Sequence, residues 1–217
     1  MVGCAPDNSL QNYNLTQNEK KICDTLQIDS TIVHQIRIYN SSVIEPFHYS
    51  FSTIIDQLGE RETDPMYYPG LRFTEEHKKS DDLILKLKDS FIDKGYTIFL
   101  LRNNFNIDNA ADDIGVLKTT NKYTILKQIG TDGLNWNISN DSVIAIIKQY
   151  DKKYALELIG ARGDGCEFII HNEPKDWTEL AGELNKTCPD FVEQGWGKIE
   201  DLANEMKKTK RISFWWD

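Results

Sequence analysis

The chain has few basic residues for its length. Its 217 residues contain 25 Lys and Arg against 34 Asp and Glu, which gives a net charge of −9. Phosphate backbones and anionic membrane surfaces are bound by clusters of Lys and Arg, so this composition argues against both as general partners. We therefore expect no nucleic-acid partner, and the acidic charge fits either solubility or a basic protein partner.

Long apolar runs and nucleotide-binding motifs are also missing. No apolar run is long enough to span a bilayer, so we expect no transmembrane segment. The phosphate-binding patterns GxGxxG and GK(S/T) do not occur, so nucleotide binding is unsupported and we expect no cofactor. Hydrophobic residues still make up 40% of the chain, which is enough for a real core.

Cysteine is sparse and widely spaced, at Cys4, Cys23, Cys166 and Cys188. None of the pairs has CxxC spacing and none has zinc-finger spacing to a His, so we predict no metal site. Glu167 and His171 share one face of a predicted strand but lie about 13 Å apart, at roughly 3.3 Å per residue, too far to share an ion. We expect reduced, half-buried thiols.

Cys4 allows a second interpretation. The opening residues Met1-Val2-Gly3-Cys4-Ala5 and the polar stretch after them resemble the tail of a bacterial lipoprotein signal, but the apolar signal segment is missing. The sequence as it stands predicts a cytoplasmic protein. The alternative is a membrane-anchored lipoprotein, lipidated at Cys4, if the start lies inside a longer precursor with an upstream signal peptide.

Three regions follow one another along the chain. Residues 1–18 are a polar N-terminal linker, a possible lipoprotein tail. Residues 19–79 read as an irregular N-terminal extension with a short helix over 19–26; three Pro and two Gly interrupt residues 43–74. Residues 80–217 alternate helix and strand patterns, beginning with a helix that Ser80 caps and Gly95 ends. We predict an α/β or α+β fold: a single domain with a mixed sheet of about five strands flanked by helices.

The last eight residues, Lys210 to Asp217, are central to the predicted sheet. They hold two of the five Trp, and a disordered tail would not carry so much apolar surface to its end. We predict a terminal strand inserted into the sheet. A hairpin is predicted before it, with strands over 154–159 and 167–171, and Cys166, Phe168 and Ile170 face the core.

Several separated segments of the second half carry a resemblance to a known family. They are Tyr123-Thr124-Ile125-Leu126, Thr131 to Trp136, Ile159-Gly160-Ala161 with Asp164, Cys188 to Gly195, and the closing Phe214-Trp215-Trp216-Asp217. In order and spacing they resemble a bacterial family known as domain of unknown function 4253, over roughly Tyr96 to Asp217. The resemblance implies a fold and a bacterial origin, but no activity. Gly163 and Gly165 stand where aromatic residues are expected, so a pocket shaped by them would be lost or widened.

Candidate binding residues lie on loops of this second half. They are Asp132, Asn135, Asp164, Cys188, Asp190, Gln194, Trp196 and Trp216. Loops on a rigid scaffold carry binding groups, and we expect any polar site where the loop with Asp132 and Asn135 meets the loop with Asp190 and Gln194. Turn and cap formation explains the same Asp and Asn residues equally well, and the Trp residues are better explained as core than as an apolar wall.

Two functions from different classes remain open, and no catalytic residue is assigned. The first is a non-enzymatic protein- or ligand-binding module, in one version an immunity-type protein against a basic toxin. The alternative is a hydrolase or thiol enzyme that uses Cys188 or the carboxylates of Asp132, Asp164 and Asp190, although a packed structural Cys and turn-forming Asp are the simpler explanation. An enzyme needs these groups to converge in one cleft, whereas a binding module needs an exposed aromatic patch.

Overall fold

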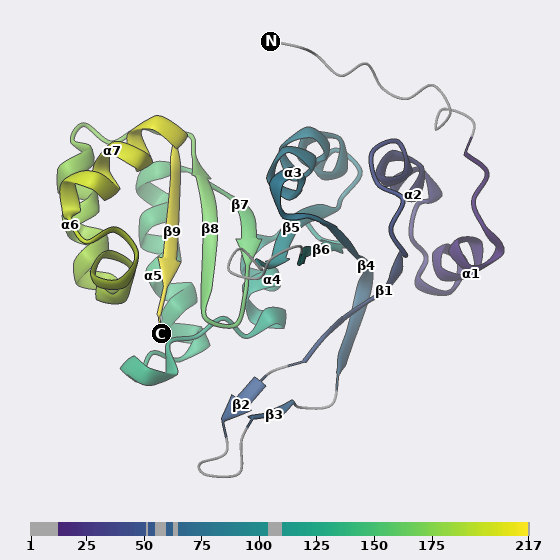
Figure 1. Cartoon of the computed structure of the whole chain (residues 1–217), viewed down its shortest axis with the longest axis horizontal. Helices are drawn as coiled ribbons and strands as arrows, with labels where there is room; N and C mark the ends of the chain where they lie inside the picture. The colour runs from purple at the N-terminus through teal and green to yellow at the C-terminus, as the bar shows by residue number, and fades with distance from the viewer. Residues whose placement is uncertain (1–12, 51, 55–59, 63–64, 104–109, 217) are drawn as a thin grey trace. The chain divides into compact units, whose positions relative to one another are not determined.

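The structure is a computed structural model that describes residues 13–50, 52–54, 60–62, 65–103 and 110–216 (Figure 1). The chain forms two compact units, residues 1–120 and residues 121–217. The predicted lipidation site Cys4 and most of the predicted N-terminal linker lie outside the described residues. None of the helices in the described ranges has the length and apolar character needed to cross a membrane.

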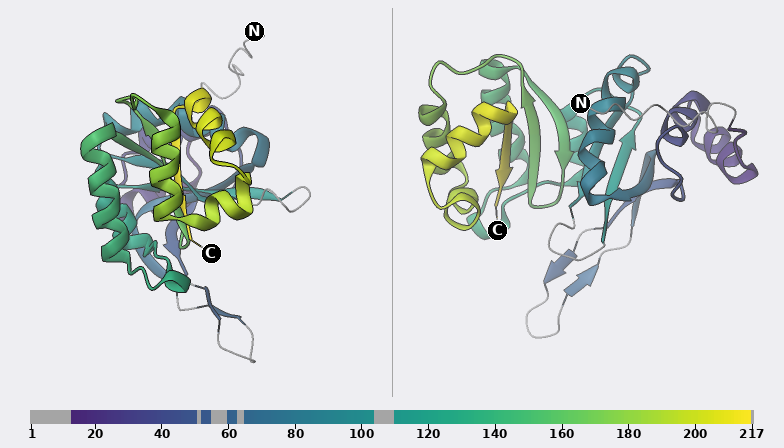
Figure 2. Two further views of the ribbon diagram at one scale, coloured as in Figure 1. Left: turned by 90° about the vertical axis from the view of Figure 1, so that its left-hand side faces the viewer. Right: turned by 45° about the horizontal axis from the view of Figure 1, so that its top comes forward.

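The first unit contains an antiparallel sheet with the strand order β1-β4-β6-β5. The strands are β1 (Glu45–Tyr49), β4 (Met66–Glu76), β5 (Thr97–Arg102) and β6 (Ala111–Leu117). A separate small pair consists of β2 (Ser52–Ile54) and β3 (Glu60–Glu62). The helices are α1 (Gln17–Leu26), α2 (Ser30–Arg37) and α3 (His77–Ile92), and α3 packs on β4, β5 and β6 (Figure 2).

The prediction that residues 43–74 are irregular is wrong, because this range contains β1 and most of β4. Pro69, which suggested a break, lies where the register of β1 against β4 shifts, between the pairs Pro46↔Leu71 and His48↔Tyr67. The ladder is interrupted at this bulge, so the missing N–H of proline costs little there. The carbonyl of Pro69 still accepts a hydrogen bond from the backbone N–H of Lys118, 3.0 Å away.

The predicted start of α3 at Ser80 is also wrong, because the helix begins one turn earlier, at His77. Ser80 is buried inside the first turn, and its hydroxyl lies 2.6 Å from Oδ2 of Asp112 on β6. Asp112 is fully buried and also contacts Nδ1 of His77 at 3.0 Å. The serine thus fixes the helix to the sheet rather than capping it. The helix ends before Gly95, which has the positive φ of 85° expected for a stop.

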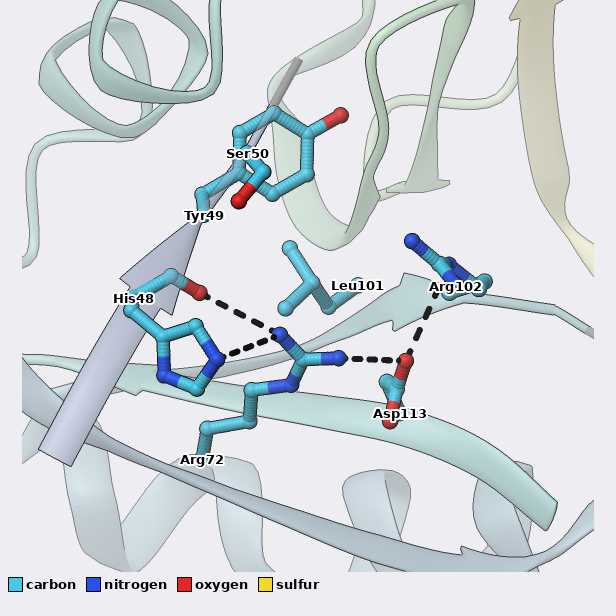
Figure 3. A pocket seen from close by; sticks show the side chains of 7 residues that line it. All are labelled: His48, Tyr49, Ser50, Arg72, Leu101, Arg102 and Asp113. Atoms are coloured by element: carbon cyan, nitrogen blue, oxygen red, sulfur yellow. Dashed lines mark hydrogen bonds and ion pairs between the residues drawn. The ribbon is translucent and has the colours of Figure 1, made fainter. Parts of the chain in front are cut away.

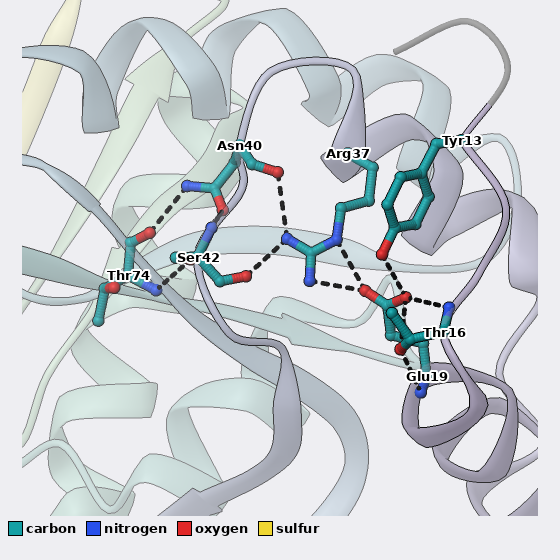
Figure 4. A network of polar contacts seen from close by, with 7 residues as sticks. All are labelled: Tyr13, Thr16, Glu19, Arg37, Asn40, Ser42 and Thr74. Atoms are coloured by element: carbon teal, nitrogen blue, oxygen red, sulfur yellow. Dashed lines mark hydrogen bonds and ion pairs between the residues drawn. The ribbon is translucent and has the colours of Figure 1, made fainter. Parts of the chain in front are cut away.

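A buried polar network anchors the first two helices (Figure 4). Arg37 of α2 donates from Nε to Oε1 of Glu19 on α1 at 2.7 Å, while Tyr13 and the Thr16 cap donate to the other carboxylate oxygen. Arg37 also donates to the carbonyls of Asn40 and Ser42. Asn40 in turn donates to the carbonyl of Thr74 on β4 at 2.8 Å. The network therefore links both helices to the sheet of the first unit.

The second unit contains a three-stranded antiparallel sheet with the order β7-β8-β9. Its strands are β7 (Leu156–Ala161), β8 (Gly165–Ile170) and β9 (Arg211–Trp215). Its helices are α4 (Lys122–Ile129), α5 (Asn140–Tyr154), α6 (Trp177–Thr187) and α7 (Ile199–Thr209), with short helical turns at η2 (Leu134–Trp136) and η3 (Phe191–Trp196). The fold class predicted from the sequence, sheet flanked by helices, is confirmed. The two units contribute four and three sheet strands, more than the five expected.

The predicted terminal strand is β9, which pairs with β8 and buries every second side chain. Ile212 and Phe214 are fully buried, and Trp216 directly after the strand is buried as well. Phe214 lies at the centre of an aromatic group, with the ring of Tyr150 edge-on at 5.0 Å and the ring of Phe168 at 6.2 Å. These contacts explain why the apolar residues continue to the end of the chain.

Candidate functional site

Trp216 joins three loops at one end of the sheet in the second unit. Its backbone N–H donates to the carbonyl of Asp164 at 3.0 Å, and its indole Nε1 donates to the carbonyl of Thr187 at 3.0 Å. The ring also lies against Gly133, where an added Cβ would be 2.9 Å from Cγ of Trp216. The predicted site residue Trp216 is therefore a buried anchor, with only 3% of its surface exposed.

The loop around Asp132 contacts the hairpin turn that holds Asp164. The backbone N–H of Asp132 donates to the carbonyl of Gly163 at 2.8 Å. The carboxylate of Asp164 accepts a hydrogen bond from Nε1 of Trp215 at 2.9 Å and lies 3.6 Å from Nε of Arg162. Burial raises the pKa of Asp132, and a hydrogen bond from the backbone of Leu134 partly offsets this. The two predicted carboxylates thus lie on neighbouring turns, and both make structural contacts.

The loop with Asn135 and the loop with Gln194 meet at Asp190. Nε1 of Trp136, in the turn η2, donates to Oδ2 of Asp190 at 2.5 Å. Nε2 of Gln194, in η3, donates to Oδ1 of the same carboxylate at 3.4 Å. Asp190 itself is buried, with 7% exposed surface. One carboxylate therefore holds both loops in a fixed relation.

The second unit and the end of the first match a known family model. Residues 113–217 match the model described as Domain of unknown function (DUF4253). The match confirms the resemblance predicted from the sequence, and it includes the three loops that Trp216 joins. No curated protein and no solved structure matches the chain.

Within the DUF4253 region, Cys188 has the properties of a structural thiol. Its side chain is fully buried, and its Sγ lies 3.5 Å from the carbonyl of Leu184 one turn earlier. Burial raises the pKa of Cys188 to about 12. Since the thiolate is the nucleophilic form, a thiol that stays protonated near neutral pH is poorly suited to nucleophilic catalysis.

His171 and Glu167, which were considered as a pair of metal ligands, have separate partners. His171 contacts Oε2 of Glu157 at 2.9 Å, whereas Glu167 pairs with Nη1 of Arg211 at 3.5 Å. Across the residues that the structure describes, no group of three or more His, Cys, Asp or Glu is arranged to hold a metal ion.

Large apolar side chains are exposed on the two loops that meet at Asp190. Leu134 is 74% exposed, Trp136 is 45% exposed, and Trp196 at the end of η3 is 36% exposed. Asn135, Glu193 and Gln194 on the same loops are exposed as well. We call these six residues the loop surface. Sequence reasoning named Asn135, Gln194 and Trp196 as candidate binding residues but missed Leu134, Trp136 and Glu193. The sequence does contain an indication that Leu134 and Trp136 are exposed, because both are large apolar residues in a short turn between Gly133 and Asn137.

Proposed function

We propose that the protein is a non-enzymatic binding module whose DUF4253 region binds a protein partner through the loop surface. The observation that carries this proposal is the exposure of Leu134, Trp136 and Trp196 on loops that one buried carboxylate holds together. Exposed aromatic side chains on a fixed loop lose little conformational entropy on binding, and Trp is enriched among residues that dominate interface energies. An exposed apolar group of this kind favours contact with another protein over contact with water.

Charge indicates the chemistry of the partner. Residues 131–136 and 189–196 contain three acidic residues, Asp132, Asp190 and Glu193, and no Lys or Arg. The whole chain carries a net charge of −9. A partner surface with an apolar centre and basic residues around it would complement this arrangement. An immunity-type protein that neutralises a basic toxin is one specific version of this proposal.

The contacts of the catalytic candidates support binding over hydrolysis or thiol chemistry. The carboxylates of Asp164 and Asp190 already accept hydrogen bonds from Trp215 and Trp136. Cys188 is buried and protonated, as described above. A reaction would require these groups to give up contacts that hold the loops in place.

The test is capture by loop-surface variants of the full chain. Immobilised wild type, Leu134→Asp and Trp136→Ala are compared for the proteins they retain from the source organism. Val43→Asp is the matched control, because Val43 is 71% exposed in the first unit and the change adds the same charge. We expect one specific protein to be retained by wild type and by Val43→Asp but not by the two loop variants. Added salt should weaken its binding to wild type. That protein is then purified and its affinity for each variant is measured.

Two results would contradict the proposal. One is that all four proteins retain the same set of partners. The other is that the purified partner binds Leu134→Asp and Trp136→Ala as tightly as it binds wild type, which would place the contact elsewhere on the chain.

A further inference from the structure

We propose that the first unit contains a second, separate site that binds inorganic phosphate or the phosphate group of a small monoester. The site is a cavity of about 210 Å³, and the seven residues that line it are His48, Tyr49, Ser50, Arg72, Leu101, Arg102 and Asp113 (Figure 3). These residues come from all four strands of the sheet in the first unit. Only Asp113 falls within the DUF4253 match, so this site is independent of the loop surface.

Two irregularities of the sheet shape this cavity. The register of β1 against β4 shifts between Pro46 and His48, and the register of β5 against β6 shifts between Leu100 and Arg102. In the first shift the extra residues lie on β4, and in the second the extra residue, Leu101, lies on β5. Bulges re-aim side chains and are common next to functional sites. Here His48 and Arg102 follow directly after the two shifts, and both line the cavity.

The guanidinium of Arg72 is held in a defined orientation at the centre. Its Nη2 donates to Oδ2 of Asp113 at 2.8 Å, and its Nη1 lies 3.2 Å from Nε2 and 3.4 Å from the carbonyl oxygen of His48. The side chain of Arg72 is 21% exposed, so it is partly desolvated but reachable. A guanidinium has five N–H donors, and these contacts among the described residues leave donors for a ligand.

The same contacts determine the protonation of His48. Arg72 can only donate, so Nε2 of His48 must accept from it. Nδ1 of His48 lies 3.2 Å from the carbonyl of Pro46, which can only accept, so the proton is on Nδ1. In this arrangement Nε2 is the acceptor and Nδ1 the donor. His48 thus holds the Arg72 guanidinium in place without the negative charge that a carboxylate in the same position would bring, and that would repel an anion.

The cavity carries a local positive charge in an acidic unit. Two guanidiniums, those of Arg72 and Arg102, share the single carboxylate of Asp113, and Nε of Arg102 lies 3.8 Å from it. The charged side chains that line the cavity thus sum to +1. By contrast, residues 1–120 contain 12 Lys and Arg against 18 Asp and Glu, a net charge of −6. Arg102 is 58% exposed and can turn towards a ligand without breaking the pair between Arg72 and Asp113.

The size and donor set favour a compact tetrahedral oxyanion. A cavity of 210 Å³ is smaller than the roughly 300–1,000 Å³ of sites for drug-sized ligands, so it suits a single anionic group. Arg72, Arg102 and Ser50 line the cavity from different strands or their ends, and Figure 3 shows Ser50 on the opposite side of Leu101 from Arg72. Donors on several sides match the oxygens of a phosphate better than the two oxygens of a planar carboxylate.

The test is an NMR titration of the full chain with inorganic phosphate at pH 8 and low salt, with acetate as a second probe. We expect saturable shifts of the amides of residues 48–50, 72, 102 and 113, and at least several-fold weaker binding of acetate. Arg102→Gln is expected to weaken phosphate binding roughly tenfold, as loss of a charge-assisted contact does. Lys79→Gln is the matched control, because Lys79 is 63% exposed on α3 and the change removes the same charge.

The outcomes separate clearly. Absence of saturable shifts, or equal binding by wild type and Arg102→Gln, would overturn the site. Acetate binding as tight as phosphate would overturn the assignment to phosphate. A phenyl phosphate titration then separates the sources, because tighter binding than inorganic phosphate indicates a monoester. The spectra also report folding, so Arg72→Gln adds a second measurement only if its spectrum keeps the native dispersion. A failed partner capture by the loop surface would leave these results unaffected.

Discussion

Arg37 and Glu19 form a buried ion pair between the first two helices, with Nη2 of Arg37 2.6 Å from Oε1 of Glu19. Their side chains are only 8% and 4% exposed. Breaking such a pair by removing one partner leaves an uncompensated buried charge, which costs about 3–5 kcal/mol. We therefore predict that Arg37→Met lowers the free energy of unfolding by about that amount at pH 7, measured by urea denaturation.

The matched control for this prediction is Lys79→Met. Lys79 and Glu76 form an exposed pair at 2.9 Å, with both side chains more than half exposed. Exposed pairs contribute about 0–1 kcal/mol, so this variant should unfold close to wild type. A loss of less than about 1 kcal/mol for Arg37→Met would show that the buried network does not hold the N-terminal helices to the sheet.

The pH dependence of stability provides a second prediction at the same site. Burial raises the pKa of Glu19, but hydrogen bonds from Tyr13, Thr16 and Arg37 outweigh it and lower the pKa from 4.5 to about 2. A carboxylate with a lowered pKa in the folded state stabilises the protein above its unfolded pKa. This contribution, on the order of 3 kcal/mol, is lost as the pH falls from about 4.5 towards 2.

The measurement compares wild type with Glu19→Gln by urea denaturation at several pH values. The difference in unfolding free energy should be largest above pH 5 and shrink steadily towards pH 2, because protonated Glu19 then resembles Gln. A difference that is constant across this range would mean that Glu19 is not the group whose ionisation matters. Taking the difference between the two proteins removes the effect of all other titrating groups.

Gly133 offers a test of the Trp216 anchor. A Cβ at this position would lie 2.9 Å from Cγ of Trp216, closer than real Cβ atoms approach, and 3.0 Å from its Cβ, which is unusually tight. We predict that Gly133→Ala destabilises the protein by about 1–3 kcal/mol, because the ring or the loop must move. Gly182→Ala is the control: nothing lies within 4 Å of its added Cβ, and it stands inside α6. There the change should stabilise by up to about 1 kcal/mol, since Ala favours helix more than Gly does.

The second unit could be predicted well from the sequence because its signals are local. The apolar stripes of its helices, the glycine at position 130 with a positive φ, and the alternation in β9 all depend on neighbouring residues. The same local rules placed Asp132, Asp164 and Asp190 on turns. They did not show which residues of those turns are exposed. Trp136 is normally expected in a core, and its exposure depends on the distant carboxylate of Asp190.

The first unit was harder to predict because its strands are held by contacts far apart in the sequence. β4 contains Pro69 and Gly70, which indicate a turn when only neighbouring residues are considered. Its pairing with β6 joins residues about 40 positions apart. The cavity around Arg72 is formed by residues from four strands beside two register shifts, and no spacing along the chain indicates that His48, Arg102 and Asp113 will meet.

Thiol reactivity separates the binding proposal from thiol chemistry most directly. Cys23, Cys166 and Cys188 are all buried, and burial raises the pKa of each; for Cys188 it reaches about 12. At pH 8 a thiol with that pKa is only about one part in ten thousand thiolate, which is the reactive form. We therefore predict that a Cys4→Ser variant reacts very slowly with a thiol-specific disulfide reagent when folded. In denaturant, the same variant should react quickly at its three remaining thiols and release three equivalents of the reagent's leaving group.

Modification of Cys188 within seconds in the folded protein, located by peptide mass analysis, would restore the thiol enzyme as the better explanation. Slow modification whose rate rises in step with urea-induced unfolding is the result expected for a structural thiol.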